Sequence, residues 1–206
     1  MAQPIALAGS LVVTLLLPSA GAAQGNGSLA TARIFEALAL RPGATVCEVG
    51  AGNGELSIAA ADRVGSGGRV YTSELGDERL RALRDKVAAA KRPNIHVIAA
   101  GADHTNFPDA ACDALFMRNV YHHIESPGPM SASLAASLKP GGRLAIVDFT
   151  PPGAEAPLPA DRDQDDMHGV TPDSVRRELA DAGFVAEKTE TGIGRWFMVV
   201  AVRPGS

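Results

Sequence analysis

A strand-like apolar run leads directly into a glycine-rich turn at residues 46–54, which read Val-Cys-Glu-Val-Gly-Ala-Gly-Asn-Gly. Glycine has no Cβ, so three glycines in five positions let the backbone bend tightly and approach a ligand closely. The spacing of Gly50, Gly52 and Gly54 differs from the Gly-x-Gly-x-x-Gly of dinucleotide sites, where a pyrophosphate rests on the following helix N-terminus. Glu48 lies where it would repel a phosphate, so the turn favours a ligand with a cationic end.

A second acidic residue, Glu74, closes the next apolar run and lies twenty residues past Gly54. In nucleotide-binding sheets a carboxylate at this point accepts hydrogen bonds from ribose hydroxyls. With these two features the chain resembles the class I S-adenosylmethionine-dependent methyltransferases. The first motif of that family is an acidic residue followed by Gly-x-Gly-x-Gly, and its second is an acidic residue at the end of the next strand. The resemblance covers residues 28–204 and includes the Lys-Pro-Gly-Gly turn at 139–142.

The resemblance implies S-adenosyl-L-methionine as the cofactor, with binding residues at two strand ends and two later connections. Asp103, in the polar connection after the run that begins at Ile95, is the candidate contact for the adenine amino group. The full set of expected cofactor-binding residues is Glu48, Gly50, Ala51, Gly52, Gly54, Glu74, Leu75, Asp103, His104, Arg118 and Asn119.

Apolar runs and helical spacing alternate along most of the chain. Strand-length runs begin near Thr45, Val70, Ile95, Ala114 and Leu144, and helical spacing is clearest at 78–91 and 130–138. This alternation predicts a parallel sheet covered by helices. A helix is then expected at 173–182, followed by strands at 184–191 and 195–202 that a Gly-Ile-Gly turn joins. The predicted fold is therefore a Rossmann-like three-layer α/β sandwich, with a mostly parallel seven-stranded sheet and a C-terminal antiparallel hairpin.

The residues directly after the fourth predicted strand are the candidates for catalysis. Tyr121, His122 and His123 would lie at the carboxyl edge of the sheet, where parallel sheets hold their ligands. One interpretation makes one of the two histidines the general base for the methyl acceptor, with Tyr121 donating a hydrogen bond. The other has all three packing and capping a helix near Glu125 without touching substrate. Both remain open from the sequence.

A segment without clear periodicity, residues 151–166, follows Asp148 at the end of the fifth predicted strand. We interpret it as a lid over the acceptor pocket, since long irregular loops often serve binding. Its acidity suits a cationic or amine acceptor, although aromatic and aliphatic acceptors stay open. The polar residues of this region are Asp161, Asp163, Asp165, Asp166 and His168, and the candidate apolar walls are Phe149, Met167 and Trp196.

The cysteines and histidines predict neither a disulfide nor a metal site. Cys47 and Cys112 fall in predicted core strands, where free thiols behave as small apolar side chains, although neighbouring strands make a bridge conceivable. The chain has no Cys-x-x-Cys, and we expect the adjacent His122 and His123 to point in different directions and to chelate poorly.

Composition indicates one domain at residues 28–204, since 206 residues with 46% hydrophobic content suit a single three-layer core. A net charge of -4 argues against a nucleic-acid partner. Residues 1–23 resemble a signal peptide, with an apolar stretch and small residues before Gln24, but no basic residue precedes Arg33. The apolar stretch is too short for a stable membrane span. We expect an exported protein, periplasmic or secreted, if this leader is a signal peptide, and a cytoplasmic one otherwise.

The predicted function is an enzyme that transfers the methyl group of S-adenosylmethionine to a small-molecule acceptor by in-line displacement. The alternative is a non-catalytic relative that binds S-adenosylmethionine as a sensor or partner-binding module. A nicotinamide-dependent reductase is disfavoured, because its third glycine would lie one position later. The sequence leaves open the acceptor, the methylated atom and the oligomeric state.

Overall fold

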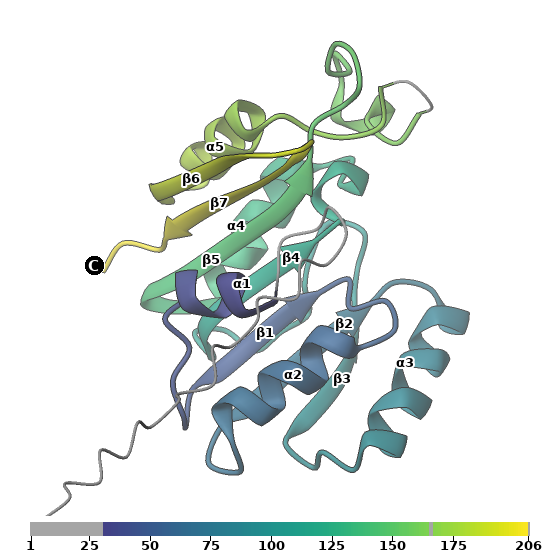
Figure 1. Ribbon diagram of the computed structural model, residues 1–206, viewed down its shortest axis with the longest axis vertical. Coiled ribbons are helices and arrows are strands. Elements are labelled where there is room, and N and C mark those ends of the chain that lie inside the picture. The colour runs from purple at the N-terminus through teal and green to yellow at the C-terminus, as the bar shows by residue number, and fades with distance from the viewer. Residues whose placement is uncertain (1–30, 165–166, 206) are drawn as a thin grey trace, which may run out of the picture.

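Seven strands form one sheet in the order β3-β2-β1-β4-β5-β7-β6 in the computed structural model, which describes residues 31–164 and 167–205 (Figure 1). The predicted leader at 1–23 lies outside the described residues, as do Asp165 and Asp166. The strands are β1 (Thr45–Val49), β2 (Arg69–Glu74), β3 (Ile95–Ala99), β4 (Cys112–Arg118), β5 (Leu138–Phe149), β6 (Val185–Ile193) and β7 (Trp196–Val202).

The pairing of the strands confirms the predicted fold class. β1 pairs in parallel with β2 and β4, β2 with β3, and β4 with β5. β7 is antiparallel to both β5 and β6, as expected for strands that a tight turn joins. Gly192 and Gly194 in that turn have φ of +82° and +60°, which glycine adopts readily.

Helices cover both faces of the sheet, giving three layers (Figure 1). One face carries α1 (Thr31–Ala37), α2 (Glu55–Val64) and α3 (Asp77–Ala90), and the other carries α4 (Pro127–Ser137) and α5 (Pro172–Asp181). Each face has its own apolar core. In α3, for example, Leu80, Leu83 and Val87 are buried at helical spacing while the charged residues between them face solvent. Within the described residues, no helix is both long enough and apolar enough to cross a membrane.

The carboxyl ends of the parallel strands gather at one edge of the sheet, where the glycine turn meets β2. The N–H groups of Gly50 and Ala51 both donate to the carbonyl of Ser73, at 3.0 Å each. Two short 3₁₀ helices, η1 (Tyr121–His123) and η2 (Pro159–Asp161), follow β4 and β5 at the same edge. The fold therefore brings the predicted cofactor and acceptor segments together.

The Lys-Pro-Gly-Gly segment lies inside β5 rather than forming a turn ahead of it. Cys112 pairs with Leu138 and Ala114 pairs with Arg143, so the register shifts across the intervening residues 139–142. Gly141 has a φ of +77° there. Residues 139–142 thus keep a turn-like backbone, and they form an irregularity within the longer strand β5.

The expectation of free thiols was wrong, because Cys47 and Cys112 form a disulfide. The two residues lie on the neighbouring strands β1 and β4 and face the same core, with α4 and α5. Their Cα atoms are 5.9 Å apart, within the range that a disulfide bridges. Both side chains are fully buried.

Candidate functional site

The three glycines of the turn differ in what surrounds them. All have positive φ, at +71° for Gly50, +54° for Gly52 and +75° for Gly54. A Cβ on Gly50 would lie 2.4 Å from Val120 Cγ2, and one on Gly54 would lie 2.8 Å from Leu83 Cδ1. A Cβ on Gly52 would have no neighbour within 4 Å. Gly50 and Gly54 are therefore required for packing, whereas Gly52 borders open space that a ligand can fill.

Glu74 is held against this turn by backbone hydrogen bonds. Its Oε2 accepts from the Gly52 N–H at 2.7 Å, and its Oε1 accepts from the Leu75 N–H at 2.9 Å. Arg79 Nε lies 3.3 Å from the same Oε1. A carboxylate has about four lone-pair sites, so Glu74 keeps acceptor capacity for hydroxyl donors of a ligand beside Gly52.

Glu48 is buried beneath the turn and engages α2 and β2. Its Oε2 forms a hydrogen bond with Ser57 Oγ, which lies 2.7 Å from Thr72 Oγ1. Burial raises the pKa of Glu48 to about 8, against the opposing effects of Ser57 and of the Arg118 charge. Ser57 carries one hydroxyl proton for two oxygen partners, so the second proton comes from the Thr72 hydroxyl or from a protonated Glu48. The structure thus gives Glu48 a neutral, internal role and does not bring it to the open side of the turn, where contact with a cation was predicted.

The remaining predicted cofactor residues lie at the same sheet edge with different exposure. In the loop after β3, Asp103 is half-buried and His104 is exposed, and their Oδ1 and Nδ1 atoms are 2.6 Å apart. This hydrogen bond lowers the pKa of Asp103. At the end of β4, Arg118 is half-buried, and Asn119 is exposed with a φ of +59°. Leu75 is 43% exposed, so it presents an apolar side chain beside Glu74.

His122 forms a buried pair with Asp148, at the end of β5. Its Nδ1 lies 2.8 Å from Asp148 Oδ1, and its backbone N–H donates to Asp148 Oδ2 at 3.2 Å. Both side chains are almost completely buried, at 2% and 0% exposure. A carboxylate that accepts from Nδ1–H fixes the tautomer in which Nε2 carries a lone pair. The sequence placed both residues at this edge but did not indicate that they pair.

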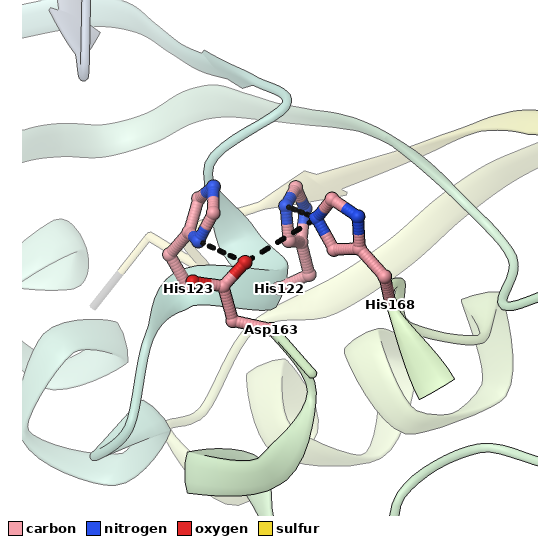
Figure 2. Close-up of side chains that lie close together, drawn as sticks. All are labelled: His122, His123, Asp163 and His168. Carbon is pink, nitrogen blue, oxygen red and sulfur yellow. Dashed lines mark hydrogen bonds and ion pairs between the residues drawn. The ribbon is translucent and has the colours of Figure 1, made fainter. Parts of the chain in front are cut away.

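Three further residues surround the free edge of the His122 ring (Figure 2). His168 Nε2 lies 2.9 Å from His122 Nε2 and 3.3 Å from Asp163 Oδ1. His123 Nδ1 lies 3.1 Å from the same Asp163 oxygen. The pKa of His123 is lowered, chiefly by burial and also by the neighbouring His122. We call His122, His123, Asp163 and His168 the histidine cluster.

The expectation that His122 and His123 point in different directions was wrong. Their ring centroids are 3.9 Å apart, with the planes at 44°. The two residues are consecutive members of the 3₁₀ turn η1. Phe149 packs beside the cluster, with its centroid 4.8 Å from that of His122, and Trp196 packs on the outer side of Phe149.

Tyr121 does not join the cluster. Its side chain is fully buried and its Oη lies 3.5 Å from Ser131 Oγ. Burial raises its pKa well above the usual value. Tyr121 therefore packs in the core, apart from His122 Nε2 and its neighbours, and its predicted hydrogen bond to the acceptor stays a prediction.

The predicted lid is anchored to α5 by ionic contacts that the sequence analysis missed. Arg162 is 3% exposed, and its NH2 group lies 2.5 Å from Glu178 Oε1. Its Nε lies 3.2 Å from Glu155 Oε1. Glu155 also accepts hydrogen bonds from Thr171 and Ser174 at the start of α5. The one arginine in an otherwise acidic stretch was the available signal for this anchor.

A cavity of about 300 Å³ lies at the opposite edge of the sheet, near the amino ends of β4 and β5, and is lined in part by Leu40, Asp113 and Lys139. It is separate from the glycine turn and from the histidine cluster.

Comparison with known proteins matches the part of the chain that contains the glycine turn and η1. Residues 47–146 match the family model described as a methyltransferase domain. The chain is 31% identical over 117 residues to the ubiquinone/menaquinone biosynthesis C-methyltransferase UbiE of Marinomonas sp. (strain MWYL1), which covers 56% of this chain and 47% of that protein. The chain thus matches about half the length of this relative.

Solved structures share the fold at lower identity. A SAM-dependent methyltransferase from Aquifex aeolicus superimposes with a TM-score of 0.74 at 23% identity, over 85% of this chain and 90% of that chain. Phosphoethanolamine N-methyltransferase 2 of Haemonchus contortus, solved in complex with S-adenosyl-L-methionine, has a TM-score of 0.70 at 15% identity, over 84% and 52%.

Proposed function

The chain belongs to the class I S-adenosylmethionine-dependent methyltransferases, and we propose that it transfers the methyl group of this cofactor to a small-molecule acceptor. One observation carries the proposal. The glycine turn with open space at Gly52 and the buried His122–Asp148 pair lie at the same edge of the sheet. Similarity to a small-molecule C-methyltransferase supports an acceptor of the same general kind.

The cofactor is proposed to bind over the glycine turn. Gly52 leaves room for close approach, and Glu74 offers acceptor oxygens to ribose hydroxyls. Leu75 and Asp103 lie on the connections after β2 and β3 and are proposed to contact the adenine. Bound S-adenosylmethionine supplies an electrophilic methyl carbon and leaves as a neutral thioether, so the protein mainly has to hold the acceptor in line.

The histidine cluster is proposed to receive the acceptor. The Nδ1–H of His122 is directed at Asp148, so its Nε2 can accept the proton that the acceptor loses as its new bond to carbon forms. The proton then passes to solvent through the exposed side of the cluster, where His123 and His168 are 47% and 42% exposed. Phe149 supplies an apolar wall beside the ring.

The alternative is a relative that binds S-adenosylmethionine as a sensor or partner-binding module without transfer. Both the methyltransferase and the sensor must bind the cofactor, and calorimetry with S-adenosylhomocysteine tests this binding. Absence of binding to the purified full chain would overturn both proposals. A labelled-methyl screen over small acceptors then separates them, since product formation requires catalysis. Binding without transfer to any acceptor favours the sensor.

The base is tested with His122→Ala and His123→Ala in the same screen. His96→Ala is the matched control, because His96 is an exposed histidine on β3. We expect His122→Ala to lower turnover strongly and His96→Ala to leave it unchanged. Full activity in both cluster variants would remove the histidine base while leaving the transferase proposal standing.

We also propose that the protein is exported. The predicted leader at residues 1–23 and the disulfide between Cys47 and Cys112 support this, because disulfides persist mainly in oxidising compartments. Fractionation of the producing cells and N-terminal sequencing of the product test it. A cytosolic protein that begins at Met1 would contradict the proposal.

A further inference from the structure

We propose that the histidine cluster is a binding site for a divalent transition-metal ion, with zinc as the reference metal. One nitrogen each of His122, His123 and His168 and one carboxylate oxygen of Asp163 lie within 4.8 Å of one another. The close-up shows the three rings arranged around the Asp163 oxygen (Figure 2). His122 and His123 belong to η1, whereas Asp163 belongs to the lid and His168 follows it closely, more than thirty residues later in the sequence.

The distances between ligand atoms fit a shared metal. With bonds of about 2.0–2.1 Å in a tetrahedral site, neighbouring ligand atoms are about 3.3 Å apart. The three measured separations are 2.9 Å, 3.1 Å and 3.3 Å. All the separations lie within 4.8 Å, so the widest has to close by up to about 1.5 Å, which the partly exposed side chains of His123 and His168 can provide.

The surroundings of His122 provide a second, independent observation. Metal-binding histidines usually donate their other ring N–H to a carboxylate, which fixes the tautomer and the ring orientation. Asp148 does this for His122 at 2.8 Å and is itself fully buried. The lone pair of His122 Nε2 is thereby directed at His168 Nε2, only 2.9 Å away. Two imidazole nitrogens at this distance need a proton or a cation between them.

The ligand chemistry selects the class of metal. Three imidazoles and one carboxylate suit zinc, iron, cobalt, nickel or copper, whereas magnesium and calcium prefer sites made of oxygen ligands. A bound ion would also join the lid to η1, since Asp163 and His168 belong to one segment and His122 and His123 to the other.

If the proposed methyl transfer holds, the ion would act on the acceptor, and this consequence rests on that function. A metal lowers the pKa of a bound hydroxyl, so the acceptor would lose its proton to water and attack as the anion. His122 Nε2 has one lone pair, so in that state it serves as a ligand and not as the base. Metal binding itself requires no cofactor or acceptor and is measured without them.

The test is isothermal titration of zinc chloride, and separately of magnesium chloride, into the chelator-treated full chain without a polyhistidine tag. We expect one zinc per chain, with micromolar or tighter affinity, and no comparable binding of magnesium. His168→Ala and Asp163→Asn should each weaken zinc binding at least tenfold. These two positions, with side chains 42% and 57% exposed, are chosen because replacing the buried His122 can impair folding. His96→Ala is the control and should bind zinc normally.

A spectroscopic measurement checks the ligands directly. Cobalt substituted at the site should give visible absorption bands that disappear in His168→Ala but persist in His96→Ala. If His122 and His168 merely share a proton, the protein will bind neither zinc nor cobalt at this site. The absence of both would overturn the proposal. Zinc binding that His168→Ala and Asp163→Asn leave unchanged would also overturn it, since the ion would then lie elsewhere.

Discussion

Asp148 Oδ1 lies 2.8 Å from Nδ1 of His122, and both side chains are almost entirely excluded from water. The second carboxylate oxygen accepts from the backbone N–H of His122, so the ring and its peptide are held by one side chain. Phe149 packs beside the ring, with the two planes at 50°. The orientation of the His122 ring is therefore determined by the end of β5.

Asp148→Asn should lower the turnover of methyl transfer at least ~100-fold if His122 is the base. An amide can donate to Nδ1 and so favour the tautomer whose Nε2 carries the proton. Binding of S-adenosylhomocysteine, measured by calorimetry, should be unchanged. Asp173→Asn is the control, because Asp173 is 86% exposed and its ion pair within residues 31–164 and 167–205 is with Arg176 on its own helix. Turnover equal to wild type in Asp148→Asn would show that this pair does not serve catalysis.

Gly52→Ala should weaken cofactor-product binding at least tenfold while the protein still folds. A methyl group here meets no protein atom within 4 Å, so it would project into the space assigned to the cofactor. Gly43→Ala is a matched control, because Gly43 also has a positive φ, +83°, and open surroundings. Both variants carry backbone strain of about 1–2 kcal/mol. Equal affinities in the two variants would place the cofactor elsewhere.

Glu48→Gln should remove a pH dependence of stability between pH 4.5 and 8. The folded-state pKa of about 8 exceeds the ordinary 4.5, so the folded protein binds this proton more tightly than the unfolded chain does. The group therefore contributes its full stability below pH 4.5 and loses it as pH rises toward 8, by at most ~1.4 kcal/mol per pH unit. Denaturant unfolding at several pH values measures the slope.

Above pH 8 we expect Glu48→Gln to be more stable relative to wild type than it is at pH 5. Glu78→Gln, at an exposed position at the start of α3, should leave the slope unchanged. The same slope in wild type and Glu48→Gln would mean that Glu48 is ionised in the folded protein.

Removal of the disulfide should destabilise the protein by about 4 kcal/mol, because the bridge closes a loop of 65 residues and restricts the unfolded chain. The midpoint of thermal unfolding would fall by roughly 8–16 °C. Thermal unfolding of a Cys47→Ala/Cys112→Ala double variant tests this, with the same measurement on the wild type under reducing conditions. A loss below about 1 kcal/mol would mean that the bridge contributes little to the stability of the folded protein.

Local patterns in the sequence predicted most of the fold. The glycine turn, the alternating strands and helices, and the C-terminal hairpin each depend on residues close together in the chain, and all were recovered. The Lys-Pro-Gly-Gly segment shows the limit of such patterns. Its turn residues were read correctly, but only the pairing of β4 with β5 reveals that the strand begins before them.

In the candidate site, the sequence pointed to those residues that belong to short local motifs. Gly52 and Glu74 were identified from motifs, and their hydrogen bond follows from the adjacency of β1 and β2. The contact between His122 and His168 depends on the path of the lid, which no periodicity encodes. The Cys47–Cys112 bridge likewise depends on how β1 and β4 meet, and the separate runs do not reveal this.

The antiparallel pairing of β7 with β5 has a consequence for how the protein matures. Phe197 lies opposite Asp148 in that pairing, so the carboxylate that orients His122 is secured by a strand synthesised after every member of the histidine cluster. A nascent chain can form the glycine turn early, because β1, α2 and β2 are synthesised before the histidine cluster and the hairpin. Asp148 gains its neighbour Phe197 only once the hairpin of β6 and β7 has formed and β7 has docked on β5.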